Sequence, residues 1–257
     1  MRIQIMNTEC LVTIITPCLN SEKTIRDTME SILYQTYKNI EYIIIDGGST
    51  DRTVELLQKY KQLFRGRMRY VSETDKGIYD AMNKGIRMAH GKVIGIINSD
   101  DYYEEDTVET IVAYMSDARY QVIYGYCRLI NEVAVKGIAK RCHKDLKQGM
   151  IPHPTCFVTR ETYKKYGMFL TAFQIAGDYE LMLRLYVSGN VQFIQVKRIV
   201  ASFRMGGISG DVKKAKREKL WIRCYYQVVS FLKSWRKYID GRKEYVPYFN
   251  MGTWFKV

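Results

Sequence analysis

The stretch that decides the fold is Ile43-Ile44-Ile45-Asp46-Gly47-Gly48-Ser49-Thr50-Asp51, where an apolar, β-branched run ends in an acidic, glycine-rich turn. A short apolar run of this kind is typical of a strand that is buried on both faces of a parallel sheet. The glycines permit a tight turn, and Ser49 or Thr50 is suited to cap the helix that follows. Asp46 is a carboxylate fixed at the strand end, where it either belongs to a helix-capping turn or accepts hydrogen bonds from a base or a ribose.

Strands and helices alternate on both sides of this stretch. We expect buried strands at Leu11–Thr16, Ile40–Asp46, Met68–Ser72, Val93–Asn98 and Val122–Tyr126. Amphipathic patterns between them predict helices at Thr24–Gln35, Asp51–Lys61, Gly77–Ala89 and Glu105–Met115. This alternation predicts a doubly wound α/β sheet, in which ligands lie at the carboxyl ends of the strands.

The second half of the chain has a less regular pattern, which we expect to complete the same sheet. Short strands are predicted at Thr155–Thr159, Val191–Val196 and Ile199–Phe203, and a helix at Asp178–Val187. We therefore expect residues 1–210 to form one domain and residues 211–257 to form a C-terminal extension.

The C-terminal extension concentrates the positive charge of the protein. The protein has 40 Lys and Arg residues and 27 Asp and Glu residues, which gives a net charge of +13. The segment Asp211–Tyr245 alone has 11 basic and 4 acidic residues, or +7. Apolar residues recur there at helical spacing, at Trp221, Cys224, Tyr225, Val228, Val229, Leu232 and Trp235. Such a basic amphipathic helix either packs on its own domain or attaches to an anionic membrane surface. We expect no nucleic acid partner, because no motif that reads bases accompanies the charge.

Several classes of protein are excluded by what the sequence lacks. No apolar run approaches the roughly 18 residues that span a bilayer, and no secretory signal precedes the first strand, so we expect a cytoplasmic protein. The six cysteines include no CxxC pair and no spacing suited to zinc, which indicates reduced thiols. Neither a GxGxxG fingerprint after the first strand nor a P-loop is present.

Two further acidic clusters lie next to predicted strands and helices. Asn98-Ser99-Asp100-Asp101 follows a buried strand, where it is either a solvated acidic turn or a site whose paired carboxylates hold Mg²⁺ or Mn²⁺. Gly177-Asp178-Tyr179-Glu180-Leu181 opens a helix. A carboxylate in the first turn of a helix either interacts with the helix dipole or serves as a general base.

These clusters join two more segments in a fixed order along the chain, Val12-Thr13-Ile14-Ile15-Thr16-Pro17-Cys18-Leu19-Asn20 and Asp75-Lys76-Gly77-Ile78-Tyr79-Asp80-Ala81-Met82-Asn83-Lys84-Gly85. Together, from Leu11 to Gly210, the five segments resemble the family 2 glycosyltransferases with the GT-A fold. These are inverting nucleotide-sugar transferases of bacterial polysaccharide synthesis. The resemblance implies a Rossmann-like mixed sheet flanked by helices, to which the basic amphipathic extension is added.

The resemblance also implies a role for individual residues. It places contacts with the nucleotide-sugar at Thr16, Pro17, Asn20, Glu22, Asp46, Gly48, Ser49, Asp80, Asn83, Asp100 and Arg204, with Asp46 binding the base. Asp101 is expected to bind the metal, Mn²⁺ or Mg²⁺, and Asp178 to be the catalytic base. The segment from Arg204 to Ser209 resembles the family's mobile loop near the diphosphate.

Two positions depart from the family pattern. Gly47 replaces the second aspartate of the commoner Asp-Asp-Gly-Ser turn, and Gly177 stands where many members have Glu. The base therefore falls on Asp178 alone, with Glu180 as a reserve candidate. His153, between two prolines, is either a turn residue or a contact with the acceptor or a phosphate.

The activity that the resemblance implies is inverting transfer of a hexose or an N-acetylhexosamine from a UDP-sugar to a hydroxyl of a saccharide acceptor. We expect the acceptor to be lipid-linked, the product to be a cell-surface polysaccharide, and the protein to act on the inner face of the cell membrane. The alternative is a non-catalytic member of the fold that binds a nucleotide-sugar in an assembly complex. A sugar-phosphate nucleotidyltransferase is disfavoured, because its glycine-rich opening motif is missing.

Overall fold

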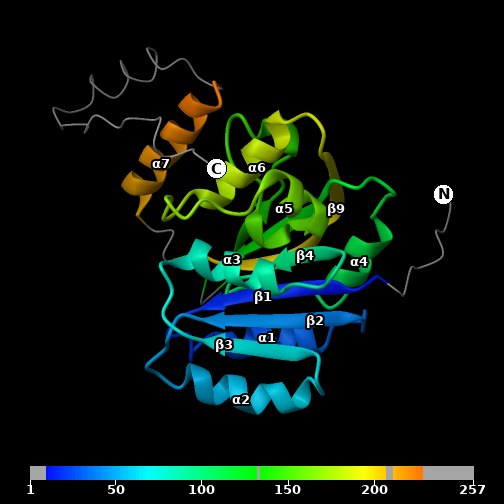
Figure 1. The fold of residues 1–257 in the computed structure, drawn as a ribbon, viewed down its shortest axis with the longest axis vertical. Helices are drawn as coiled ribbons and strands as arrows, with labels where there is room; N and C mark the ends of the chain where they lie inside the picture. The colour runs from blue at the N-terminus through cyan, green and yellow to red at the C-terminus, as the bar shows by residue number, and fades with distance from the viewer. Residues whose placement is uncertain (1–9, 132–133, 207–210, 228–257) are drawn as a thin grey trace.

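The computed structural model describes residues 10–131, 134–206 and 211–227, and the described strands form one mixed sheet flanked by helices (Figure 1). The strands are β1 (Val12–Cys18), β2 (Ile40–Asp46), β3 (Met68–Ser72), β4 (Val93–Ile96), β5 (Tyr102–Tyr103), β6 (Gln121–Ile130), β7 (Val135–Ala139), β8 (Phe157–Thr159) and β9 (Gln192–Arg204). The helices are α1 (Ile25–Leu33), α2 (Thr53–Leu63), α3 (Ile78–Met88), α4 (Thr107–Ala113), α5 (Arg160–Tyr166), α6 (Gly177–Val187) and α7 (Val212–Tyr225).

The sheet has the order β3-β2-β1-β4-β8-β6-β9-β5, and β7 pairs with β6. β1 is parallel to both β2 and β4, with Val12 opposite Ile40 on one side and opposite Val93 on the other. β8 runs antiparallel to β4 and β6, whereas β9 is parallel to β6. The parallel half predicted from the first part of the sequence is thus confirmed, and the second part makes the sheet mixed.

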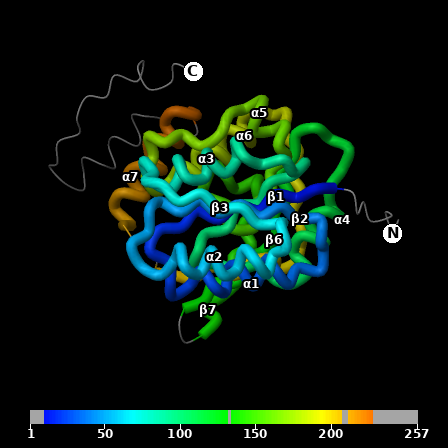
Figure 2. Tube along the Cα trace, turned by 60° about the horizontal axis from the view of Figure 1, so that its bottom comes forward, coloured from blue at the N-terminus to red at the C-terminus, as the bar shows by residue number. Residues whose placement is uncertain are grey.

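Each face of the sheet carries its own apolar core, as Figure 2 shows by the helices on either side. Successive residues of a strand point to opposite faces, so the isoleucine run of β2 serves both cores. Ile44 packs in the core beneath α1 and α2, whereas Ile43 and Ile45 pack in the core beneath α3 and α6. Because both faces are buried, the strand is apolar at each position from Tyr42 to Ile45.

Four elements differ from the sequence expectation, and one of them is the two-residue strand β5, which is not predicted. β9 is one long strand where two short ones are predicted, and its register with β6 shifts near Tyr126. α5 and β7 are not predicted, because most of their residues are polar or exposed, which removes the apolar periodicity.

The six cysteines are unpaired, as expected. Among the described residues, no helix combines the length and apolar character needed to cross a membrane.

The C-terminal extension contacts the domain through α7. Ile222 of α7 is only 1% exposed and belongs to the same core as α6. α7 therefore packs on the core of the domain, and the boundary at residue 210 stays a prediction. Of the apolar positions predicted for the extension, Val228, Val229, Leu232 and Trp235 lie outside the described residues.

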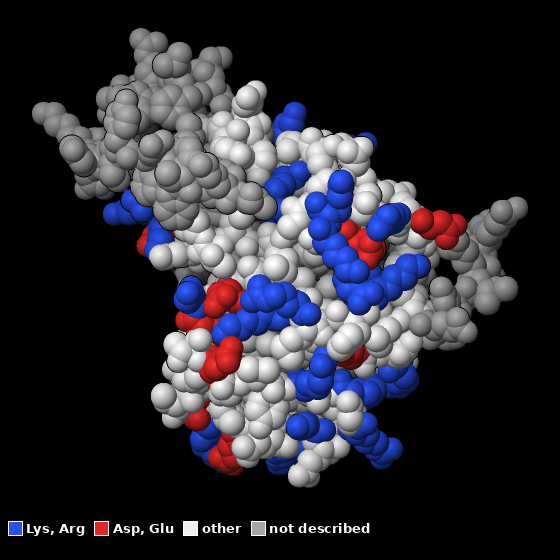
Figure 3. All heavy atoms as spheres, in the orientation of Figure 1, with Lys and Arg blue, Asp and Glu red and all other residues white. Residues whose placement is uncertain are grey.

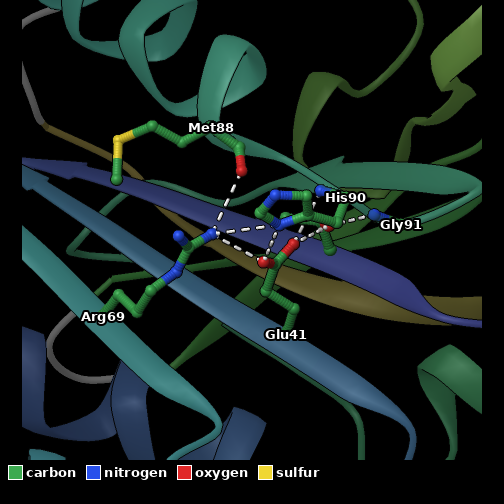
Figure 4. A network of polar contacts seen from close by, with 6 residues as sticks. Glu41, Arg69, Met88, His90 and Gly91 are labelled. Carbon is green, nitrogen blue, oxygen red and sulfur yellow. Dashed lines mark hydrogen bonds and ion pairs between the residues drawn. The ribbon is translucent and has the colours of Figure 1, made fainter.

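A network of hydrogen bonds and an ion pair joins β1, β2, β3 and the segment after α3 at the amino end of β2 (Figure 4). This edge of the sheet is opposite the edge at which Asp46 lies. Glu41 accepts hydrogen bonds from the Thr13 hydroxyl (2.6 Å) and the His90 backbone N–H (2.9 Å), and forms an ion pair with Arg69 (2.6 Å). Arg69 also donates to the carbonyl of Met88 at 3.0 Å. Burial raises the pKa of Glu41, but the hydrogen bonds from His90 and Thr13 and the charge of Arg69 outweigh it and lower the pKa overall.

We predict that Glu41→Gln lowers the free energy of unfolding by about 1–3 kcal/mol at pH 7, because it takes the charged acceptor from buried Thr13, from His90 and from Arg69. A carboxylate whose pKa is lower in the folded state stabilises the fold above its unfolded-state pKa. The difference between wild type and variant should therefore shrink as the pH falls below about 4. Urea unfolding at several pH values measures it. The control is Glu55→Gln, since Glu55 forms an exposed pair with Arg52, and no measurable change is expected there.

Candidate functional site

Three loops that follow the carboxyl ends of β1, β2 and β4 are tied to one another by hydrogen bonds. The Asn20 side chain accepts a hydrogen bond from the backbone N–H of Thr50 at 2.9 Å, and the backbone N–H of Ser21 donates to Thr53 Oγ1 at 2.8 Å. The hydroxyls of Ser21 and Ser99 lie 2.7 Å apart and share a hydrogen bond. The predicted binding segments of the three strands therefore form one connected surface.

Asp46 lies inside this surface. It is completely buried, and its Oδ2 accepts hydrogen bonds from the backbone N–H of Ser49 at 3.0 Å and the hydroxyl of Ser72 at 2.6 Å. Its Oδ1 accepts from the Ser49 hydroxyl and, at 3.6 Å, from the thiol of Cys18. These four hydrogen bonds hold the turn, and the contact of Asp46 with a base stays a prediction.

The other predicted nucleotide contacts on these loops differ in their exposure. Asn20, Glu22 and Gly48 are exposed, whereas Thr16 and Pro17 are buried in β1. The hydroxyl of Thr16 accepts a hydrogen bond from Tyr42 at 3.1 Å. Asn20 and Gly48 have φ angles of 48° and 86°, the left-handed conformation that tight turns require.

The gap left by Gly47 is occupied by a carboxylate from another segment. A Cβ at Gly47 would lie 3.3 Å from Oδ2 of Asp75. Asp75 Oδ1 is buried, and its partner is the Lys84 ammonium, with which it forms an ion pair at 2.5 Å. Lys84 also pairs with the more exposed Glu73 at 2.7 Å. Asp75 was not singled out from the sequence, although the missing aspartate at Gly47 was a signal to look for a substitute.

The adjacent carboxylates Asp100 and Asp101 lie beyond β4, next to the end of β9. Asp101 is completely buried, and its Oδ1 accepts a hydrogen bond from the backbone N–H of Arg204 at 2.9 Å. The Arg204 guanidinium donates to the carbonyl of Asp100 at 3.1 Å and pairs with Asp27 of α1. Burial and the charge of Asp100 raise the pKa of Asp101 well above its usual value.

The oxygen donors around Asp101 fit a hard divalent cation. Oδ1 of Asn98 is buried and has no hydrogen-bond partner among the described residues, while its amide nitrogen lies 3.4 Å from Asp101 Oδ2. Carboxylate and amide oxygens are the ligands that Mg²⁺ and Mn²⁺ prefer. No group of three or more His, Cys, Asp or Glu side chains that could hold a metal occurs in the described ranges. A cation here would depend on ligands from a bound substrate as well.

Asp178 lies in the first turn of α6 and is partly exposed. Its Oδ1 accepts a hydrogen bond from the backbone N–H of Tyr179 at 2.8 Å and a longer one from the Tyr79 hydroxyl at 3.4 Å. Tyr79 is in the first turn of α3, which begins beyond the carboxyl end of β3. Asp178 therefore lies at the same edge of the sheet as the loops described above.

The departure at Gly177 has a steric cause. A Cβ at this position would lie 2.8 Å from the ring of Tyr79, which is closer than real Cβ atoms approach a neighbour. The glutamate that many family members carry is therefore incompatible with the position of this tyrosine. Tyr79 takes the space next to Asp178 and also donates a hydrogen bond to it.

Two residues named from the sequence have internal partners instead. The Asn83 side chain donates to the carbonyl of Phe169 at 2.8 Å and accepts from its N–H at 3.0 Å, so it holds the loop at Phe169. Its contact with the nucleotide-sugar stays a prediction. Glu180 is 1% exposed and forms an ion pair with Arg184 at 2.9 Å. This buried, paired carboxylate is unsuitable as a reserve base, and that expectation is corrected.

His153 and Asp80 lie near the same region. The ring of His153 packs edge-on against Phe169 at a centroid distance of 5.9 Å. Burial lowers the pKa of His153, and the charge of Asp178 partly opposes this shift. Asp80 Oδ2 accepts a hydrogen bond from the backbone N–H of Lys76 at 3.1 Å. Gly207 and Ser209 of the predicted mobile loop lie outside the described residues.

The basic side chains on the face drawn in Figure 3 form several separate clusters, most with acidic side chains beside them. In α7, the exposed positions include Lys213, Lys216 and Arg217. Attachment of the extension to an anionic membrane stays a prediction, because much of it lies outside the described residues.

Solved structures of two other proteins share the fold of this chain. The TarS protein of S. aureus in complex with UDP-GlcNAc is 17% identical, with a TM-score of 0.70 over 88% of this chain and 69% of that chain. In another TarS structure, this chain covers 41% of the longer chain. The mannosyltransferase PcManGT of Pyrobaculum calidifontis, in complex with GDP-Man and Mn²⁺, has a TM-score of 0.60 over 92% of this chain. The fold is the GT-A fold of nucleotide-sugar transferases.

The sequence identifies the family within this class. A model of glycosyl transferase family 2 matches residues 13–175, and the chain belongs to that family. The "PGL/p-HBAD biosynthesis glycosyltransferase" of Mycobacterium tuberculosis is 27% identical over 237 residues, which cover 90% of this chain and 93% of the relative. The family and the fold inferred from the five motifs are thus confirmed.

We predict that Asp101→Asn raises Tm by about 2–4 °C at pH 7 in EDTA, because it removes a buried charge and keeps an acceptor for Arg204. Adding UDP and Mn²⁺ should raise the Tm of the wild type and leave the variant unchanged. Thermal unfolding followed by circular dichroism measures both effects. Asp117→Asn, at an exposed position, is the matched control. A lower Tm of Asp101→Asn in EDTA would contradict the role given to its buried charge.

Proposed function

We propose that this protein is an inverting, metal-dependent hexosyltransferase. It moves a hexose or an N-acetylhexosamine from a UDP-sugar to a hydroxyl of a saccharide acceptor. The observation that carries the proposal is the arrangement of two acidic sites at one edge of the sheet, Asp100 with Asp101 beyond β4 and Asp178 at the start of α6. One site suits a nucleotide diphosphate with its cation, and the other suits the removal of a proton.

The known relatives support the choice of substrates. The structure of TarS with UDP-GlcNAc favours a UDP-sugar donor, and that of PcManGT with Mn²⁺ favours a divalent cation. The mycobacterial relative is a glycosyltransferase of PGL/p-HBAD biosynthesis, and the acceptor that we propose for this chain is a lipid-linked saccharide. The proposal therefore includes action on the inner face of the cell membrane, in the synthesis of a cell-surface polysaccharide or glycolipid.

The mechanism follows from the position of Asp178. Its carboxylate accepts the proton of the acceptor hydroxyl while the hydroxyl oxygen attacks the anomeric carbon and the bond to the diphosphate oxygen breaks. The hydrogen bonds from Tyr79 and from the N–H of Tyr179 fix the orientation of this carboxylate. A single displacement inverts the anomeric centre, so an α-linked donor gives a β-glycoside.

Asp100 and Asp101, with the unpartnered Oδ1 of Asn98, would hold the cation. A divalent cation held by these residues would supply positive charge against the negative charge of the departing diphosphate. Arg204 adds a positive charge beside the pair and keeps Asp101 in place through its backbone N–H.

Asp75 belongs to the proposed nucleotide subsite. Both carboxylate oxygens of Asp46 accept hydrogen bonds within the protein, whereas Asp75 presents Oδ2 beside Gly47 at the turn that follows β2. A carboxylate there accepts hydrogen bonds from the N–H groups of a base or the hydroxyls of a ribose. Lys84 holds the other oxygen and orients the group.

We predict that the protein releases UDP slowly from one member of a panel of UDP-sugars in Mn²⁺, and that EDTA abolishes the release. Asp178→Asn should reduce the rate by about 10²-fold or more and leave UDP binding intact, because it removes only the base. Asp101→Ala should abolish both the release and its dependence on metal. UDP release is followed with a coupled assay.

Asp117→Asn should keep the wild-type rate, since this residue is exposed on another loop. An unchanged rate for Asp178→Asn would exclude this residue as the base. Binding of UDP without release from any UDP-sugar or GDP-sugar, even with saccharide acceptors, would favour the non-catalytic alternative.

We predict that Asp75→Asn weakens the binding of UDP about tenfold, because it removes a charge-assisted acceptor from the subsite. Asp46→Asn should instead lower Tm, since it disrupts the hydrogen bonds that hold the turn. Calorimetric titration with UDP in Mn²⁺ and thermal unfolding distinguish the two effects. The control is Glu73→Gln, the other carboxylate on Lys84. Equal affinities of wild type and Asp75→Asn would place Asp75 outside the subsite.

A further inference from the structure

Glu218, the only acidic residue of α7, has its carboxylate directed into the domain. Its Oε1 accepts a hydrogen bond from the backbone N–H of Gln174 at 3.0 Å. Its Oε2 accepts from the N–H groups of Ile175 at 3.0 Å and Ala176 at 2.8 Å. Three successive N–H groups therefore converge on one carboxylate, an arrangement stronger than three neutral hydrogen bonds.

The segment that Glu218 holds leads directly into the catalytic helix. Ala176 is the N-cap of α6, and Asp178 is two residues further along. The first N–H groups of a helix have no partner within it, and a negative charge near them is favourable. Glu218 supplies that charge from α7, which lies beside this segment (Figure 1).

The opposite side of the segment is held by Tyr79. Its single hydroxyl hydrogen is shared between the carbonyl of Ile175, at 2.8 Å, and, more weakly, Oδ1 of Asp178, at 3.4 Å. The backbone at Gly177 packs so closely against the Tyr79 ring that a Cβ there would lie 2.8 Å from it. A shift of the segment therefore moves Asp178 relative to its hydrogen-bond donor.

α7 is attached to the domain at more than this point. Ile222 is buried against the core that contains α6, and Lys214 donates to the side chain of Gln174. Tyr226, just beyond α7, donates to Glu180 of α6. The helix therefore remains docked when a single contact is removed, so a substitution at Glu218 tests the contact with the segment and not the docking itself.

We propose that Glu218 is a positioning residue for the catalytic base, and that α7 is consequently part of the active site. The carboxylate of Glu218 fixes the backbone of residues 174–176, and this backbone fixes the direction of Asp178 toward the acceptor hydroxyl. The inference rests on the proposed function, because it concerns the base of that reaction. It predicts that a substitution at Glu218 lowers kcat and leaves the affinity for the nucleotide unchanged, because the proposed nucleotide contacts lie on other loops.

The experiment compares Glu218→Ala, Glu218→Gln and the wild type in UDP release from the donor that the panel identifies. Glu218→Ala should lower kcat about tenfold or more, since small displacements of a catalytic group have large effects. KM for the donor and the affinity for UDP should stay within about twofold, since no donor contact is lost. Glu218→Gln keeps an acceptor for part of the segment and should recover part of the rate.

Rates are expressed per UDP-binding site, counted from the stoichiometry of a calorimetric titration, so that a smaller folded fraction does not imitate the effect. Lys216→Ala, at an exposed position of the same helix, should match the wild type. If Glu218→Ala binds no UDP, the kcat of Glu218→Gln per UDP-binding site tests the positioning role on its own.

Wild-type kcat per site in the variants that bind UDP would overturn the positioning role and leave the proposed function standing. A loss in which KM rises and kcat stays would also overturn it. A wild-type protein that releases no UDP with any donor and acceptor would remove the proposed function, and this inference with it.

Discussion

The parallel pairing of β1 with β2 and with β4 is the constraint on which the site depends. Because the three strands run in the same direction, their carboxyl ends open on one edge, and the loops that follow are close enough to exchange hydrogen bonds. The pairing itself is possible because the strands are apolar on both faces and are covered by helices on both sides. The chemistry at the edge is therefore a consequence of the core beneath it.

Two buried carboxylates at this edge are stabilised in different ways. Asp46 receives hydrogen bonds from Ser49, Ser72 and Cys18, which makes it part of the framework. Asp101 has only two donors and another carboxylate, Asp100, as its neighbour. The framework thus satisfies one negative charge completely and leaves the other in excess, which is the condition under which a cation binds.

The sequence predicts the elements better than it predicts the direction of polar side chains. Strands and helices follow from apolar periodicity, so β1 to β4 and α1 to α3 are anticipated to within a few residues. Periodicity carries no information on which neighbour a carboxylate meets. Asp46 and Asn83 were therefore given ligand roles, although the fold provides them with internal partners. Glu218 was missed because its surroundings in the sequence are basic and show only a charged helix.

The two departures from the family pattern have the same physical form. At Gly47 and at Gly177 a side chain is absent, and in each case a group from another segment occupies or borders the space. Asp75 brings a carboxylate to the first glycine, and Tyr79 brings a ring and a hydroxyl to the second. Asp75 lies in the loop after β3 and Tyr79 lies in the first turn of α3, so this one stretch of chain supplies what two motifs lack. A motif that looks incomplete in the sequence can therefore be complete in space, and the missing group is best sought among residues that would collide with a restored side chain.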